Sequence, residues 1–83
     1  MPTIEIIDSI KILMYFRDHM PPHFHVEYNE YEVIIDIRTL EKMEGRLPSK
    51  QMKKVMTWAR ENQDFLMTTW NSMNPNNHWL WKG

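Results

Sequence analysis

The chain has no cysteine and only two glycines among its 83 residues. The lack of cysteine excludes disulfides, thiolate nucleophiles and thiolate zinc sites, so a bound metal would need histidine and carboxylate ligands. No apolar run is long enough to cross a bilayer, and we expect no membrane contact. The first residues also lack the basic and apolar regions of a secretory signal, which favours a cytoplasmic protein.

Length and composition favour one small domain. A chain of this size buries roughly 60–65% of the surface of its unfolded form, and 42% hydrophobic with 25% charged residues is ordinary for a globular protein. We expect residues 1–83 to form an α+β domain in which a mostly antiparallel four-stranded sheet packs on one long C-terminal helix. The sheet would occupy residues 1–38, a loop 39–48, the helix 49–73 and a tail 74–83.

Two hairpins are predicted in the sheet region. The first pairs residues 3–7 with 10–17 around the turn formers Asp8 and Ser9. The second pairs 23–28 with 31–38 around Asn29-Glu30, because asparagine tolerates the positive φ of a two-residue turn.

The second hairpin has a predicted register. If Tyr28 pairs with Tyr31, His23 lies opposite Asp36, and the hairpin has one apolar and one polar face. The apolar face comprises Phe24, Val26, Tyr28, Tyr31, Val33, Ile35 and Ile37.

The period of the apolar residues changes after Pro48, which suits the first turn of a helix. From residue 49 to 73, apolar residues recur every three or four positions, which predicts one long helix, bent near Asn62 if at all. Asn74-Pro75 ends this pattern. The segment 39–48 contains Gly45 and is predicted to be an ordered loop or a short helical turn.

The most concentrated polar stretch is 18–26, which holds three of the four histidines and two of the five prolines. Pro21 and Pro22 cannot donate ladder hydrogen bonds, so residues 18–22 are predicted to form a loop leading into the strand at His23.

Four segments of the chain form a recognisable set, namely Asp18-His19-Met20-Pro21-Pro22-His23-Phe24-His25-Val26, Tyr28-Asn29-Glu30-Tyr31-Glu32, Ile35-Asp36-Ile37 and Trp58-Ala59. With them the chain resembles the bacterial proteins grouped as domain of unknown function 4160. The resemblance covers most of the chain but not residues 74–83, and Asn29 stands where a glycine is expected. It implies a small bacterial protein often encoded beside another small protein, as in toxin–antitoxin pairs, and it implies no established activity.

A metal site is one hypothesis for the histidines. His23 and His25 point to one side of a strand, about 7 Å apart. Asp36 or His19 would complete a ligand set suited to zinc, manganese or iron. The structural alternative is that His23 bonds Asp36 across the strands while Asp18 and His19 cap the loop.

An enzymatic hypothesis assigns the same histidines to phosphodiester cleavage. His23 or His25 would act as base and His19 as acid, with Arg17 or Arg38 stabilising negative charge. Three acidic residues on the same predicted face would repel RNA unless a metal intervened. Met1-Pro2 before a strand is also typical of tautomerases with a proline base, but here a hairpin rather than a helix follows.

A binding role is the third hypothesis. Residues 1–37 carry seven acidic and two basic residues, whereas 38–60 carry seven basic and two acidic ones, which would suit nucleic acid if the fold gathered them. The helical candidates for phosphate contacts are Lys50, Lys53, Lys54 and Arg60.

Excess apolar residues point to a protein partner or a homodimer. The chain has eight methionines, and its tail contains Trp79 and Trp81 on either side of Leu80. The alternative is that the tail folds back over the open face of the sheet.

We therefore expect a small bacterial interaction protein, as one component of a toxin–antitoxin-like pair. A metal-assisted or histidine-dependent hydrolase of nucleic acid is the alternative.

Overall fold

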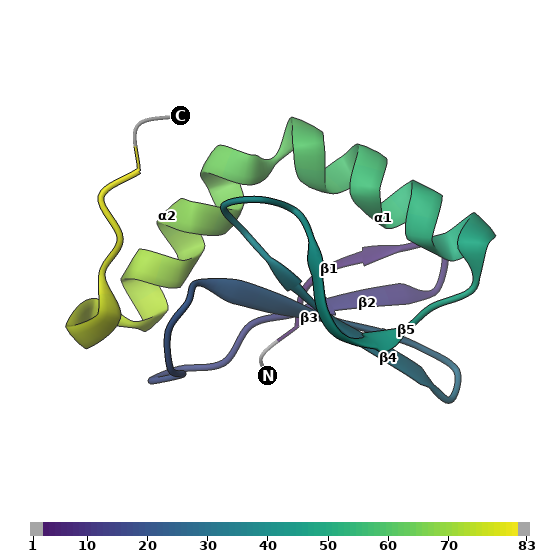
Figure 1. Ribbon diagram of the computed structural model, residues 1–83, viewed down its shortest axis with the longest axis horizontal. Helices are drawn as coiled ribbons and strands as arrows, with labels where there is room; N and C mark the ends of the chain where they lie inside the picture. The colour runs from purple at the N-terminus through teal and green to yellow at the C-terminus, as the bar shows by residue number, and fades with distance from the viewer. Residues whose placement is uncertain (1–2, 82–83) are drawn as a thin grey trace.

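The computed structural model describes residues 3–81, which form a five-stranded antiparallel sheet with two helices on one side (Figure 1). The strands lie side by side in chain order. They are β1 (Thr3–Ile7), β2 (Ile10–Leu13), β3 (His23–Tyr28), β4 (Tyr31–Asp36) and β5 (Lys42–Arg46). Two helices, α1 (Ser49–Glu61) and α2 (Gln63–Met73), precede a 3-10 turn at Pro75–Asn77. The Met1-Pro2 pattern lies outside the described residues.

Both predicted hairpins are present. Asp8 and Ser9 have φ of 46° and 68°, the backbone conformation that a tight two-residue turn between twisted strands requires. Asn29, with φ of 53°, takes the same left-handed conformation in the second turn. The predicted register of β3 and β4 is confirmed, with His23 opposite Asp36.

The core lies between the sheet and the two helices. Alternate residues of the three central strands face the helices, as in the row formed by Ile12, Val26 and Val33. Burial of such side chains contributes about 1.5–3 kcal/mol each. The largest fully buried side chains are Trp70, Phe24, Ile10, Ile12, Met14, Ile35, Ile37, Leu66, Met67, Val26, Val33 and Val55.

The prediction of a four-stranded sheet is wrong, because β5 occupies part of the segment expected to be a loop. All five residues of β5 are exposed, so no apolar alternation marks it as a strand. Gly45 has φ of 81°, and a Cβ there would lie 2.1 Å from the Glu32 carbonyl oxygen. The glycine that suggested a loop is therefore what allows β5 to approach β4 closely.

The prediction of one long helix is also wrong, since α1 ends at Glu61 and α2 begins at Gln63, with Asn62 between them. Asn62 has φ of −127° and ψ of 25°, and its side-chain Nδ2 donates to the Trp58 carbonyl at 2.8 Å. Gln63 then donates to the carbonyl oxygens of Ile37 at 2.7 Å and Arg38 at 3.1 Å. The apolar period continues through both helices, so it could not show the break.

β2 ends at Leu13, earlier than the residue 17 expected for this strand. The chain then leaves the sheet and runs toward the end of α2, where Arg17 has φ of 56°. The tail likewise lies along α2 (Figure 1), with Trp79 N–H donating to Asn71 Oδ1 at 2.7 Å. As far as residue 81, where the described chain ends, the tail follows α2 rather than the open face of the sheet.

Candidate functional site

The loop of residues 14–22 is held against the C-terminal end of α2. The backbone N–H of Arg17 donates to the Met73 carbonyl at 3.3 Å, and that of Asp18 donates to the Asn74 side-chain oxygen. Asn77 Nδ2 donates to the Asp18 carbonyl at 2.8 Å. Residues nearly 60 positions apart in the chain therefore set the path of this loop.

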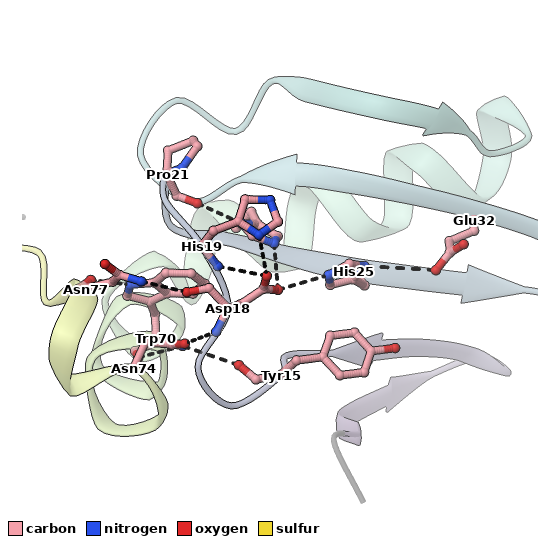
Figure 2. A network of polar contacts seen from close by, with 10 residues as sticks. Tyr15, Asp18, His19, Pro21, His25, Glu32, Trp70, Asn74 and Asn77 are labelled. Atoms are coloured by element: carbon pink, nitrogen blue, oxygen red, sulfur yellow. Dashed lines mark hydrogen bonds and ion pairs between the residues drawn. The ribbon is translucent and has the colours of Figure 1, made fainter.

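Asp18 is the central acceptor of the polar network that this loop brings together (Figure 2). Its Oδ1 accepts the His19 backbone N–H at 2.9 Å. Its Oδ2 lies 2.9 Å from His23 Nε2 and 3.5 Å from His25 Nε2. Burial alone would raise the pKa of this carboxyl, but the His19 N–H and the two histidines outweigh burial and lower it.

His23 is the most enclosed member of the network, with 4% of its side chain exposed. Its ring packs on Trp70 with 5.3 Å between centroids. Its Nδ1 lies 2.7 Å from the Pro21 carbonyl oxygen, and its Nε2 faces the Asp18 carboxylate. Both ring nitrogens of His23 thus face oxygens that are acceptors.

His25 lies two residues further along β3, on the sheet face opposite the helices. The edge of its ring meets Tyr15, with 4.7 Å between centroids. Both ring nitrogens are buried, and within residues 3–81 neither has a hydrogen-bond partner. The nearest carboxylate oxygens are Asp18 Oδ2 at 3.5 Å and Glu32 Oε2 at 3.9 Å.

The predicted pairing of His23 with Asp36 is not made, although the two residues are opposite in the sheet. Asp36 instead accepts the Arg38 backbone N–H at 2.7 Å and the Arg38 guanidinium at 2.9 Å. These bonds and the Arg38 charge outweigh burial and lower the pKa of Asp36. Asp36, the predicted metal ligand, is therefore engaged elsewhere, because the chain turns sharply after β4 and returns Arg38 to it.

Asp18 replaces Asp36 beside the two histidines. Its Oδ2 and one nitrogen from each of His23 and His25 all lie within 4.8 Å of one another. We call these three residues the Asp18–His23–His25 cluster. The signal for Asp18 in the sequence is its place in the same short proline-containing stretch as the two histidines. The structural alternative assigned Asp18 to capping the loop instead.

His19, the predicted general acid, lies at the surface of this cluster. Its side chain is 89% exposed, and its Nδ1 is 3.1 Å from Asp18 Oδ1. The two arginines proposed to stabilise negative charge have different surroundings. Arg38 forms an ion pair with Asp36, and Arg17 is exposed on the loop.

The predicted basic surface is divided between opposite parts of the fold. Lys54 on α1 pairs with Asp8, in the turn between β1 and β2, at 2.7 Å. Arg46 lies at the other edge of the sheet, 5.5 Å over the ring of Tyr31. The remaining helical candidates are the exposed residues Lys50, Lys53 and Arg60.

The predicted binding residues of the tail take part in internal packing. Trp79 and Trp81 are partly buried against the core, and Trp81 Nε1 donates to Asp64 on α2. The Arg38 guanidinium lies 4.8 Å from the centre of the Trp79 ring. Leu80, between the two tryptophans, is 81% exposed.

Comparison with known proteins finds one family model that matches most of the chain. A family model described as "Domain of unknown function (DUF4160)" matches residues 9–71, about three quarters of the chain. The chain belongs to this family. The DUF4160 match includes the whole Asp18–His23–His25 cluster but ends before Asn74 and Asn77, which hold the loop. No curated protein and no solved structure matches the chain. Over residues 3–81, no helix has the length and hydropathy to span a membrane.

Proposed function

We propose that this protein acts by binding another protein through its 15–20 loop surface, which consists of the side chains of Tyr15, Phe16, Arg17 and Met20. The observation that carries the proposal is the exposure of large apolar side chains on an anchored loop. Phe16 is 72% exposed, Met20 38% and Tyr15 36%. Neighbouring exposed apolar side chains of this kind are characteristic of interaction sites.

The anchoring of the loop makes this exposure informative. Hydrogen bonds from Asn74 and Asn77 hold Tyr15 and Asp18 in place, so Phe16 is presented outward by a defined backbone. Arg17 adopts φ of 56°, an uncommon conformation for a residue with a side chain. Uncommon backbone conformations held by surrounding structure concentrate at binding sites.

The residue types also suit a protein partner. Tyrosine, phenylalanine, methionine and arginine are enriched at the cores of protein interfaces, where aromatic side chains enter pockets on the partner. We therefore expect the partner to offer an apolar pocket for Phe16 and a carboxylate near Arg17. The first candidate is the small protein encoded by a neighbouring gene, in a cytoplasmic toxin–antitoxin-like pair.

Binding can be measured by calorimetry between this protein and the purified product of the neighbouring gene. Phe16→Ala should weaken binding about 30-fold, because an aromatic anchor contributes about 2 kcal/mol to an interface. Leu80→Ala is the matched control, since it removes an even more exposed apolar side chain from the tail. Circular dichroism should show that both variants keep the wild-type fold.

Three outcomes would contradict the proposal. One is an absence of binding to that product, and another is binding that Phe16→Ala and Leu80→Ala weaken equally. The third is self-association: if light scattering shows a dimer that Phe16→Ala dissociates, the loop surface binds a second copy of this chain rather than a different protein.

A further inference from the structure

We propose that Asp18, His23 and His25 bind one divalent transition metal ion, with zinc the best fit to the donor atoms. The ligands are not the side chains of the protein-binding surface proposed above. Asp18 and His25 lie together inside the polar network (Figure 2), whereas Phe16 is 72% exposed, although Tyr15 of that surface meets the edge of the His25 ring. Direct metal measurements on the isolated protein therefore test the metal site independently of any partner.

The first argument is the pair of acceptors around His23. The Pro21 carbonyl oxygen, 2.7 Å from Nδ1, has only lone pairs, so Nδ1 must carry the proton that it donates. In a neutral ring Nε2 is then an unprotonated lone pair, and it faces Asp18 Oδ2 at 2.9 Å. A positive species, either a second proton or a metal ion, is needed between these two atoms.

The surroundings of His25 favour a metal ion over a proton. A proton between His23 and Asp18 leaves His25 unsatisfied, with both nitrogens buried and without hydrogen bonds within residues 3–81. A buried polar group without a partner is costly. One metal ion at the point where His23 Nε2, His25 Nε2 and Asp18 Oδ2 converge would use both lone pairs and the carboxylate together.

The groups behind the histidines match the usual surroundings of metal-binding imidazoles. Such a histidine donates its second ring N–H to a carbonyl or carboxylate, which fixes the ring and raises its basicity. His23 Nδ1 has the Pro21 carbonyl at 2.7 Å, whereas the Glu32 carboxylate lies 3.9 Å from His25 Nδ1, which is too long for a hydrogen bond. His23 can therefore direct Nε2 inward while Nδ1 keeps its proton, and Glu32 is the nearest carboxylate to His25 Nδ1.

The distances require only small adjustments for a metal ion. Zinc binds imidazole nitrogen at about 2.0–2.1 Å and carboxylate oxygen at about 2.0–2.2 Å, which in a tetrahedron separates ligands by roughly 3.3 Å. The Asp18 oxygen lies 2.9 Å from one nitrogen and 3.5 Å from the other. Water can supply the fourth ligand, because the converging ligand atoms come from Asp18, His23 and His25 alone within residues 3–81.

Calorimetric titration of the full, chelator-treated chain with zinc chloride tests the proposal. We expect saturable binding of one equivalent, loss of at least about 100-fold in affinity for His25→Ala, and a loss of about 10- to 100-fold for Glu32→Gln. His78→Ala is the matched control, because His78 is an exposed histidine of the tail, and it should bind like the wild type.

A histidine-selective NMR titration with cobalt(II) keeps the test decisive if His25→Ala does not fold. The ring signals of His23 and His25 should shift at one equivalent while that of His78 does not. The proposal is overturned if zinc does not saturate at one equivalent, if His25→Ala binds like the wild type, or if His78 responds together with the cluster.

Discussion

Replacing Asn74 with alanine should destabilise the protein by about 2–4 kcal/mol. The side chain of Asn74 is almost fully buried and joins three backbone groups. Its oxygen accepts the Asp18 N–H, and its Nδ2 donates to the carbonyls of Tyr15 at 3.3 Å and Trp70 at 3.1 Å. It is the main link between the 14–22 loop and α2.

The magnitude follows from which groups lose partners. The Trp70 carbonyl keeps the bond from the Asn74 backbone N–H at 2.8 Å, so its loss is small. The Asp18 N–H and the Tyr15 carbonyl lose a partner at a partly buried position, where an unsatisfied group costs about 1–3 kcal/mol. A chain of this length has a total stability of about 4–12 kcal/mol, so the change would be a large fraction of it.

Urea unfolding followed by tryptophan fluorescence measures this change. With an m value of about 1 kcal/mol/M, the midpoint should fall by about 2–4 M, or the protein should be partly unfolded in water. Hydrogen exchange of the Arg17 and Asp18 amides should accelerate more than that of β3 and β4. Asn76→Ala, an exposed asparagine two residues away, should change stability by less than about 0.5 kcal/mol. Equal effects of the two substitutions would refute the assignment of Asn74 as the anchor of the loop.

Two further predictions concern the sheet. Gly45→Ala should lower the free energy of unfolding in urea by about 2–4 kcal/mol, because φ of 81° disfavours a side chain and the new Cβ would meet the Glu32 carbonyl. Glu44→Ala on the same strand is the control and should be nearly neutral. A neutral Gly45→Ala would show that β5 shifts freely. The pKa of Asp36 in the folded state lies below its ordinary value of 3.8, so the folded state binds fewer protons than the unfolded state. The Asp36 carboxylate therefore stabilises the fold above pH 3.8, and this stabilisation is lost as the pH falls through the folded pKa. Unfolding free energies measured from neutral pH to about pH 3 should therefore fall less steeply for Asp36→Asn than for the wild type, and identical slopes would contradict the Arg38 pairing.

The hairpins were predictable because their signals are local. Alternation with a period of two assigns Phe24 and Val26 to the core face, and Asn29 permits the turn that sets the register of β3 and β4. β5 was not predictable in this way. It pairs with β4 through the backbone, and its exposed side chains leave no alternating pattern in the sequence, while Gly45, which permits the close approach, is also typical of a loop.

The two histidines of the candidate site were predictable from the sequence, but the carboxylate was not. The spacing of His23 and His25 places both on β3, whatever the rest of the chain does. The choice of carboxylate was not local, since Asp36 lies opposite His23 and is captured by Arg38, two residues further along the chain. Knowing the strand register was therefore insufficient to identify the ligand set.

By itself the sequence determined an α+β domain, the two hairpins, the face of the sheet that enters the core and the pair of histidines on one strand. Only the tertiary structure decided that Asp18 joins those histidines and that Phe16 is presented outward. The physical reason is that hydrogen bonds from Asn74 and Asn77 direct the 14–22 loop. These contacts span nearly 60 residues, and no local period or turn signal encodes them.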